Sequence, residues 1–391
     1  MNLLFLSAWF PYPPSNGSKL RIYNLIRGLA EHGHQVTLIS FTDVSNPDTS
    51  GLESFCQAVY PIPWIEGQLT AMQRKLAFLS STPQSFSDTF SQQMVDTIHK
   101  VIGENRFDAV IASQIKAATY GRYLQGLPAI FEEIELGVMY EQFSAAESLK
   151  RKMRYGLTWG KHRQYMRKVL NDFKVCTVVS PEEKLFVEDK LNRPDIDCAV
   201  IPNGVDVEQY QPFHGKAKPN TLIYTGSFGF SANYDAMVWF VGEVLPLVQA
   251  QIPDVTLTIT GDHKNLPLPP NDGVHLAGFV DDIRPMVAQS SISLAPLLTG
   301  GGTRLKILEA MALKTPVVAT PKGAQGLNAS SGTHCLIAES PQEFSEAVVQ
   351  VLQNADLAHK LVENGYDLVK STYDWKVILP KFVELIECKI I

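Results

Sequence analysis

One segment in the last third of the chain combines residue types that suit an anionic, hydroxyl-bearing ligand. An apolar run at 293–298 leads into three glycines at 300–302, and a helical pattern follows that carries Arg304, Lys306 and Glu309. Glycines allow close backbone approach, and free N–H groups at a helix start attract anions. The two cations suit a diphosphate, and the carboxylate suits a diol such as ribose. The alternative is a tight turn whose glycines only relieve packing.

Three glutamates, Glu132, Glu133 and Glu135, follow the apolar run at 128–132. The carboxyl end of a parallel strand is where α/β folds concentrate their chemistry. A carboxylate there could deprotonate an acceptor hydroxyl or stabilise a developing oxocarbenium charge. The alternative is a solvated acidic loop, which charge runs usually form.

Gly17 lies in a Pro/Gly loop between an apolar run and a helical pattern. In that strand–loop–helix context a glycine facing a cleft would let a phosphate or an acceptor approach the backbone. The alternative is an ordinary turn glycine.

The stretch from Lys150 to Lys174 is strongly basic. It holds nine Lys or Arg residues against one acidic residue, Asp172, with apolar and aromatic residues between them. Such a helix could lie on an anionic membrane or bind a lipid-diphosphate acceptor. The alternative is a long solvated helix with one apolar face.

These residues need a scaffold, and the hydrophobic pattern predicts two α/β halves in tandem. Apolar runs alternate with helical periodicity in both halves, which predicts crossover connections and parallel sheets. Strands are predicted at 2–8, 35–41, 107–113, 128–132, 175–180 and 199–202, then at 221–226, 256–261, 274–278, 292–296 and 316–320. The polar stretch 211–220 is predicted to be a linker.

Composition narrows the class of protein. The chain has 391 residues, 45% of them apolar and 19% charged, with a net charge of −6, which excludes a surface devoted to nucleic acid. The five scattered cysteines indicate free thiols in a reducing compartment. The apolar start reads as a buried strand rather than a signal peptide, and no apolar stretch suggests a membrane span. We therefore expect a cytoplasmic protein.

The glycine-rich segment resembles the C-terminal signature of GT-B glycosyltransferases, specifically the retaining family 4 (group 1) type. The resemblance extends over nearly the whole chain. It includes residues 9–29 (WFPYPPSNGSKLRIYNLIRGL), the turn and strand at 33–38, IPNGVD at 201–206, YTGSFGFSAN at 224–233, LTITG at 257–261, GFVDD at 278–282, and the last segment from Trp375.

The sequence departs from that family in three places. The first of two glutamates eight positions apart is replaced by Gly301, although Glu309 is present. Residues 227–236 contain neither the Arg nor the Lys that commonly bind the diphosphate there, so Arg304 and Lys306 would replace them. The run at 132–135 (EEIE) lacks the family's histidine near the reaction centre, and Glu135 is the carboxylate nearest that position.

The resemblance implies an α/β fold of GT-B architecture, with two Rossmann-like domains facing across a cleft. Residues 1–205 would bind the acceptor, residues 206–372 would bind the nucleotide sugar, and residues 373–391 would return to the first domain as a helix. Predicted catalytic residues are Glu135, Arg304 and Lys306. Predicted donor-binding residues are Gly17, Gly226, Ser227, Gly301, Gly302, Thr303, Arg304, Leu305, Lys306 and Glu309.

The implied function is transfer of a hexose-type sugar from a nucleoside-diphosphate sugar to an acceptor hydroxyl in cell-surface glycan or glycolipid synthesis. Retention of configuration follows from the resemblance, and no Asp-x-Asp cluster indicates a bridging metal, so neither a metal nor a cofactor is expected. The acceptor would be a glycan, a lipid-linked substrate or a small molecule, and nucleic acid is not an expected partner. Two alternatives stay open: a nucleotide-sugar epimerase of the same fold, and an inactive nucleotide-sugar binder.

Overall fold

The computed structural model describes residues 1–64, 80, 82–134, 137–144, 148–213, 217–300 and 304–390. The chain forms two compact units, one of Met1–Pro202 with Leu379–Ile391 and the other of Asn203–Ile378. The stretch 211–220, which the sequence predicts to be a linker, belongs to the second unit.

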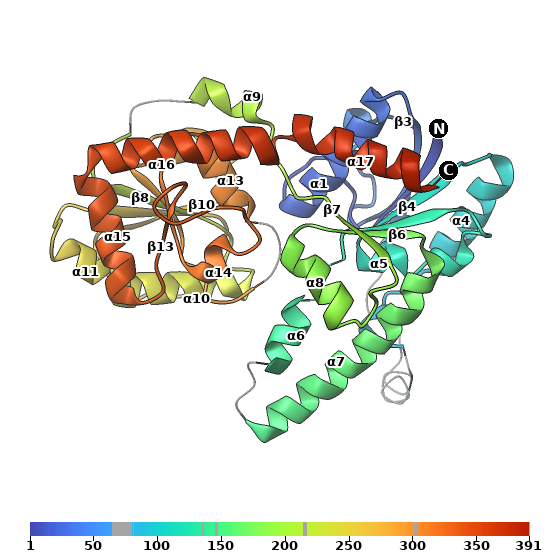
Figure 1. The fold of residues 1–391 in the computed structure, drawn as a ribbon, viewed down its shortest axis with the longest axis horizontal. Coiled ribbons are helices and arrows are strands. Elements are labelled where there is room, and N and C mark those ends of the chain that lie inside the picture. The colour runs from blue at the N-terminus through green and yellow to red at the C-terminus, as the bar shows by residue number, and fades with distance from the viewer. Residues whose placement is uncertain are drawn as a thin grey trace. The chain divides into compact units, whose positions relative to one another are not determined.

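The described residues of the first unit form a parallel sheet with the strand order β3-β2-β1-β4-β5-β6-β7 (Figure 1). The central strand β1 is buried on both faces, and a continuous apolar run suits such a strand. The strands are β1 (Asn2–Ser7), β2 (Gln35–Thr42), β3 (Cys56–Pro63), β4 (Ala109–Ser113), β5 (Ala129–Glu132), β6 (Val175–Val178) and β7 (Asp197–Val200).

Helices pack on this sheet through their apolar sides. Side chains of α4, α5, α7 and α8 share one core cluster with alternate residues of β1. The helices are α1 (Gly17–Glu31), α3 (Gln84–Ser87), α4 (Gln92–Glu104), α5 (Gln114–Ala118), α6 (Gly137–Ser144), α7 (Leu149–Val169) and α8 (Pro181–Asp189), with short 3-10 turns at Ser50–Leu52, Gly121–Tyr123 and Leu170–Asp172.

The last helix, α17 (Trp375–Ile390), starts in the second unit and ends in the first. A Cβ on Gly28 of α1 would lie 2.5 Å from Cδ2 of Leu379, so a larger residue at 28 would force Leu379 to move where the two helices touch. An ion pair joins Lys389 of α17 to Asp197 of β7 at 2.6 Å. Glu387 of α17 lies 3.4 Å from Nε2 of His34, the residue before β2, whose pKa is lowered by burial. The predicted return of the C-terminal helix to the first domain is thus confirmed.

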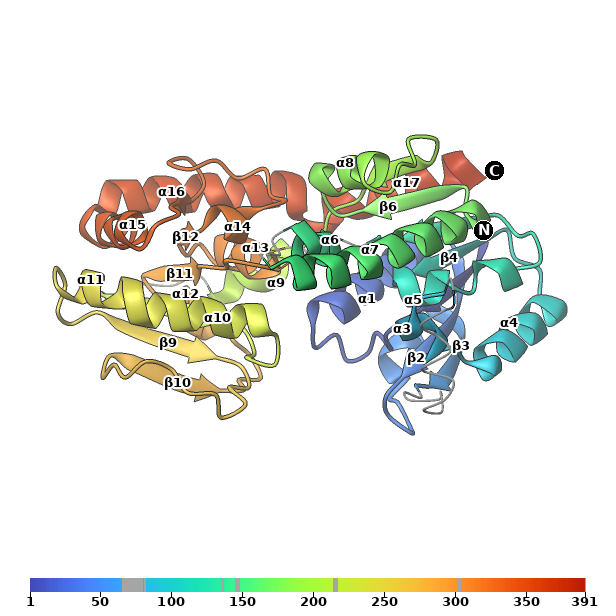
Figure 2. The same cartoon turned by 90° about the horizontal axis from the view of Figure 1, so that it is seen from below.

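The second unit repeats the plan with the parallel order β10-β9-β8-β11-β12-β13. Figure 2 shows the neighbouring strands β10 and β9 of this sheet. The strands are β8 (Thr221–Thr225), β9 (Thr256–Thr260), β10 (Val274–Gly278), β11 (Ile292–Ala295), β12 (Val317–Ala319) and β13 (Leu336–Ile337). The helices are α9 (Val207–Tyr210), α10 (Ser231–Trp239), α11 (Leu245–Gln249), α12 (Arg284–Ala288), α13 (Leu305–Ala312), α14 (Pro321–Ala324), α15 (Pro341–Gln353) and α16 (Ala355–Leu368), with a 3-10 turn at Gln211–Phe213 and π-turns at Phe240–Val244 and Val369–Tyr373.

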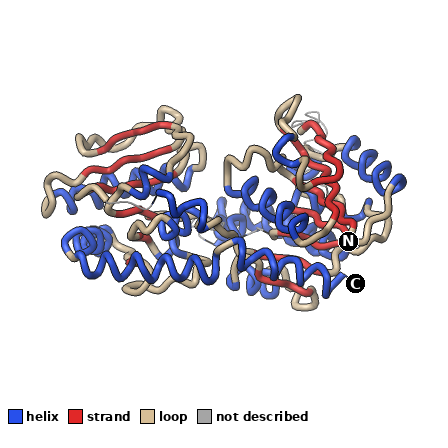
Figure 3. The backbone as a smooth tube through the Cα atoms, turned by 90° about the horizontal axis from the view of Figure 1, so that it is seen from above, coloured by secondary structure: helices blue, strands red, loops and turns tan. Residues whose placement is uncertain are grey.

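Two core clusters of this unit lie on opposite sides of its sheet. One is built with α10, α11 and α15, and the other with α9, α12 and α13. Helices therefore flank the strands, as Figure 3 shows by colour.

The predicted α/β fold of two Rossmann-like halves is confirmed. The predicted strands are present, with ends shifted by at most two residues, and the sequence missed β3 and β13.

Candidate active site

In the second unit the strand order reverses between β8 and β11, which lie side by side at the centre of the sheet. Crevices at such switch points, outside the carboxyl ends of the strands, bind ligands in open α/β sheets. Gly226 and Ser227 follow β8, and Gly300 and Arg304 follow β11. The structure therefore gathers predicted donor-binding residues from distant parts of the chain at one edge of one sheet.

Lys306, in the first turn of α13, reaches the end of β8. Its ammonium donates to the hydroxyl of Tyr224 at 2.9 Å and to Oδ1 of Asn233 at 3.3 Å, and it lies 4.1 Å from the centre of the Tyr224 ring. Burial, aided by repulsion from Arg304, lowers the pKa of Lys306 to about 7. An arriving diphosphate would reverse that shift, because an anion favours the charged ammonium.

Glu309 lies one turn further along α13. Its Oε1 accepts a hydrogen bond from the hydroxyl of Tyr210 at 3.2 Å. Burial raises the pKa of Glu309 to about 7, against the opposing effects of Tyr210 and Lys306. A carboxylate with one oxygen held by a tyrosine retains further lone pairs for a diol.

Arg304 precedes α13 and is almost fully buried. One terminal nitrogen donates to the carbonyl of Gly300 at 2.9 Å, so the side chain holds the start of the glycine-rich turn. Leu305, the next residue, packs against a core cluster of the unit. The predicted site residues Gly301, Gly302 and Thr303 lie outside the described residues.

The loop after β8 is held by backbone contacts and by Ser227. The Ser227 hydroxyl donates to the carbonyl of Asp262 at 3.1 Å and accepts from the Gly229 N–H. Gly261 has φ +105°, and a Cβ there would lie 2.7 Å from the backbone carbon of Gly226. A glycine at 261 therefore lets the loops after β8 and β9 touch at the candidate site.

In the first unit, Arg21 and Glu132 form a buried ion pair. Nε of Arg21 donates to Oε1 of Glu132 at 2.6 Å, and its terminal nitrogens donate to the carbonyls of Ile201 and Pro202 at 2.9 and 3.0 Å. The Ser113 hydroxyl donates to the other oxygen of Glu132 at 2.6 Å. With both side chains fully buried, Glu132 ties α1, β4 and the end of the first unit together.

Glu133 comes next and differs from Glu132 in its surroundings. Glu133 follows β5 and has φ 61°, and Gln114 follows β4 and has φ 69°. The side-chain amide of Gln114 donates a hydrogen bond to Oε2 of Glu133 at 3.0 Å. The Glu133 N–H donates to the Thr177 hydroxyl at 3.0 Å. Left-handed backbone at a non-glycine residue is costly and concentrates at functional sites. Glu135, the predicted catalytic carboxylate, lies outside the described residues.

A pocket of about 200 Å³ opens at the carboxyl ends of β1 and β2, beside the switch point between β1 and β4. Trp9, Trp64 and Phe41 supply aromatic walls, and Asp43 and Lys116 supply charge. The Lys116 ammonium lies 3.9 Å from the Trp64 ring centre.

Gly17 lies near that edge of the sheet as the first residue of α1. The side chain of Asn16 caps the helix by accepting from the Lys19 N–H at 3.0 Å.

The basic stretch forms α7, which Figure 1 shows extending away from the sheet at its amino-terminal end. Leu149, Met153 and Leu157 repeat every four residues there and are 76%, 69% and 50% exposed. The buried face starts only at Trp159. The predicted helix is present, but its first half has no apolar core face.

Two family models match most of the chain. The model described as Glycosyltransferase Family 4 matches residues 15–209, and the model described as Glycosyl transferases group 1 matches residues 219–354. The chain belongs to the family 4, or group 1, glycosyltransferases.

Similar proteins agree with this assignment. An uncharacterized 44.6 kDa protein in cps region of Klebsiella pneumoniae is 21% identical, covering 96% of this chain and 97% of that protein. A phosphatidyl-myo-inositol mannosyltransferase of Mycobacterium leprae is 29% identical over 49% of this chain and 54% of its own.

Two solved structures share the fold across 99% of this chain. Sucrose-phosphate synthase from Thermosynechococcus elongatus has a TM-score of 0.73 at 17% identity, and the match covers 99% of that chain. Anabaena HepE in complex with UDP and glucose has a TM-score of 0.67 at 16% identity, with 100% of that chain covered. At such identities these likenesses show the fold alone, which is GT-B.

Within this glycosyltransferase, sequence reasoning missed the residues that hold the candidate site. Tyr210, Tyr224 and Asn233 contact Glu309 and Lys306 across 73 to 99 positions. Tyr224 and Asn233 lie at the two ends of the segment 224–233 that resembles the family, but sequence reasoning assigned them no role. The sequence holds one indication of Arg21, because its charge stands between apolar residues of a helical pattern.

In the described part of the chain no three His, Cys, Asp or Glu side chains gather in a way that could hold a metal ion. Nor does any helix there have the length and apolar character to cross a membrane.

Proposed function

We propose that this glycosyltransferase moves a hexose-type sugar from a nucleoside-diphosphate sugar to an acceptor hydroxyl, with retention of configuration and without a metal. The observation that carries the proposal is that Lys306 and Glu309 lie about one turn apart on α13, at the switch point of the second unit. The ammonium suits a diphosphate and the carboxylate suits a ribose diol one turn away.

Lys306 supports the donor assignment in a further way. The loop after β8 lacks a cation at 227–236, yet the Lys306 ammonium reaches both the end of β8 and Asn233 of α10. A lysine on α13 thus supplies charge beside the loop where the family commonly has it. The HepE structure with UDP and glucose supports a nucleotide-sugar donor for this fold.

In the proposed reaction Lys306 and Arg304 neutralise charge that develops on the departing nucleoside diphosphate. Such preorganised electrostatic stabilisation is usually the largest catalytic effect. The backbone of Gly301, Gly302 and Thr303 would hold sugar hydroxyls and phosphate oxygens, as would that of Gly17, Gly226, Ser227 and Leu305. Glu135 remains the proposed carboxylate near the reacting carbon.

We place the acceptor in the first unit. The pocket with Trp9 and Trp64 suits the C–H face of a sugar ring, with Asp43 and Lys116 available to its hydroxyls. Such pockets, mostly apolar with a few polar groups, are typical of small-molecule sites. Glu133, with its strained backbone, stands at the same edge of the sheet and is a second carboxylate, besides Asp43, that could orient an acceptor.

The acceptor is proposed to be lipid-linked, and the enzyme to work at the cytoplasmic membrane surface through the stretch from Lys150 to Lys174. The exposed Leu149, Met153 and Leu157 amid basic residues of α7 support this contact. Each Lys or Arg near an anionic surface contributes about 1 kcal/mol. A Lys150/Arg151/Lys152→Glu variant should stay in the supernatant of anionic vesicles at low salt, where wild type sediments; wild type in the supernatant would refute the contact.

The experiment that tests the function begins with binding of a nucleotide panel to the pure protein. The bound nucleotide's sugar conjugates are then incubated with and without a cell lipid extract, and the products are identified. Sugar on an extract component supports transfer. An isomerised donor without extract would instead identify an epimerase, and tight donor binding with neither transfer nor slow hydrolysis would identify an inactive binder.

A further inference from the structure

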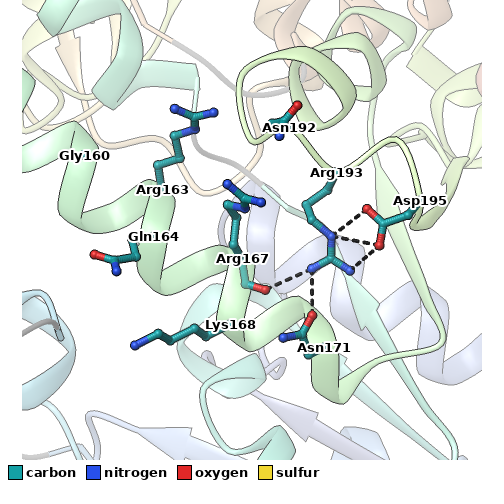
Figure 4. A pocket seen from close by; sticks show the side chains of 9 residues that line it. All are labelled: Gly160, Arg163, Gln164, Arg167, Lys168, Asn171, Asn192, Arg193 and Asp195. Atoms are coloured by element: carbon teal, nitrogen blue, oxygen red, sulfur yellow. Dashed lines mark hydrogen bonds and ion pairs between the residues drawn. The ribbon is translucent and has the colours of Figure 1, made fainter.

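A basic pocket of about 590 Å³ lies between the second half of α7 and the loop before β7 (Figure 4). Its residues come from α7, from the 3-10 turn after it and from 192–195, so it lies near the amino-terminal ends of β6 and β7. The acceptor pocket and Glu133 lie at the opposite, carboxyl edge of the same sheet. The lining residues are Gly160, Arg163, Gln164, Arg167, Lys168, Asn171, Asn192, Arg193 and Asp195.

Two arginines of α7 one turn apart, Arg163 and Arg167, point towards the side where Asn192 and Arg193 lie, whereas Gln164 and Lys168 point away (Figure 4). Among the described residues, no hydrogen bond or ion pair engages the guanidinium group of Arg163 or of Arg167. The Nε of Arg163 is buried with no acceptor. A buried charged donor left unsatisfied is costly, so an anionic acceptor would stabilise this arrangement.

The opposite wall is fixed rather than mobile. Arg193 donates to both oxygens of Asp195 at 2.9 to 3.1 Å, to the backbone carbonyl of Arg167 at 2.9 Å and to Oδ1 of Asn171 at 3.0 Å. Of the residues that the structure describes, Asp195 is the one acidic residue that lines the pocket, and Arg193 already engages its carboxylate. Arg167 also helps to lower the pKa of Asp195, but the lining carries four cationic side chains against this one carboxylate, so it stays strongly positive.

The helix dipole explains only part of this cluster. Arg167 and Lys168 lie in the last turn of α7, where cations are favourable without any ligand. Arg163 lies one turn earlier, with its Nε buried. Adjacent guanidinium groups that face one space are the arrangement proteins use for phosphate, which accepts paired N–H bonds.

We infer that this pocket binds a phosphate group through the guanidinium groups of Arg163 and Arg167. The phosphate is that of a lipid headgroup or of a free phosphate or diphosphate. Because the pocket lies at the edge away from the proposed chemistry, the bound group is not the reacting one. This site does not depend on the donor assignment.

Titration calorimetry with inorganic pyrophosphate tests the site in a Lys306→Met background, which weakens the proposed donor site. Adding Arg163→Gln and Arg167→Gln should raise the dissociation constant about tenfold or more, since charge-assisted hydrogen bonds are lost. Lys150→Gln with Arg151→Gln is the matched control. It removes equal charge from the exposed first half of α7 and should leave pyrophosphate binding unchanged.

Flotation with phosphatidylcholine vesicles, with and without phosphatidic acid, separates the two sources. If the Arg163/Arg167 variant loses flotation specific to phosphatidic acid, and pyrophosphate competes with that flotation in wild type, the pocket holds a lipid phosphate. If the variant loses only pyrophosphate binding, the pocket holds a free phosphate. Pyrophosphate affinity in the Arg163/Arg167 variant equal to that of the control would overturn the inference.

Discussion

Replacing Lys306 with methionine should abolish the pH dependence of nucleoside-diphosphate binding above neutrality. In the free protein, burial and Arg304 hold the pKa of Lys306 at about 7. A diphosphate binds the ammonium form, so the affinity of wild type should fall as pH rises above 7. Each unit of pH can cost at most about 1.4 kcal/mol, or about tenfold in affinity, and the loss levels off when only the neutral lysine is left.

Between pH 7.5 and 9.0 the charged fraction of Lys306 therefore falls about 25-fold. The neutral lysine still leaves the binding that Lys306→Met retains, so with a bond worth about 1.5–3 kcal/mol the dissociation constant should rise by a smaller factor, about 3- to 15-fold. The other groups facing Lys306 should not contribute. Burial keeps Tyr224 neutral, Arg304 stays charged, and Glu309 ionises through about 7 and is charged above it. A terminal phosphate, with its second pKa near about 6, is already fully ionised.

Titration calorimetry at several pH values with UDP, or with whichever nucleotide the panel selects, provides the measurement. Lys306→Met should bind about 5- to 30-fold more weakly at pH 7.5, because a charge-assisted bond worth about 1.5–3 kcal/mol is lost and the lysine is only partly charged there. Its affinity should be flat up to pH 9. Lys360→Met, at an exposed lysine of α16, is the control and should keep the wild-type slope. The reasoning would be refuted if the dissociation constant of wild type did not change with pH, or if that of Lys306→Met still rose with pH.

Three further predictions concern the two units separately. Glu309→Ala should weaken nucleotide binding about 5- to 150-fold, because hydrogen bonds to a ribose diol worth about 1–3 kcal/mol are lost, and unchanged affinity in a folded variant would exclude the ribose role. Arg304→Ala should lower kcat/KM and weaken nucleoside-diphosphate binding more than nucleoside binding; equal losses in calorimetry would show that its charge does not act on phosphate. Glu132→Ala should lower the free energy of unfolding by about 3–5 kcal/mol in urea, since Arg21 is left as a buried unpaired charge, and a loss under about 1 kcal/mol would mean that Arg21 finds another partner.

The alternation of apolar runs and helical spacing predicts most of this fold because parallel strands buried on both faces carry a continuous signal. The two strands that sequence reasoning missed lack that signal. β3 (Cys56–Pro63) is only partly buried, and β13 (Leu336–Ile337) is two residues long. β13 exists because it pairs with β12, which only the folded chain supplies.

Some features of the candidate site follow from local sequence, and others depend on contacts that only the folded chain provides. Arg304, Lys306 and Glu309 are visible in the sequence because a glycine-rich turn and the helix after it place them within two turns. Their pKa shifts and partners depend on burial and on residues such as Tyr224 that the sheet brings close. Glu132, at the end of β5, looks like the two glutamates that follow it in the sequence, and only the position of Arg21 makes Glu132 a structural residue.

The central claim is that the second unit binds a nucleotide sugar whose sugar is then transferred. Its most direct test is transfer of labelled sugar from the bound donor to the lipid extract, with wild type and Lys306→Met compared at pH 7. The account predicts release of nucleoside diphosphate in step with a labelled product that has the donor's anomeric configuration, and a clear loss of rate in the variant. An intact donor in the presence of wild type and extract, or equal rates in wild type and variant, would contradict it.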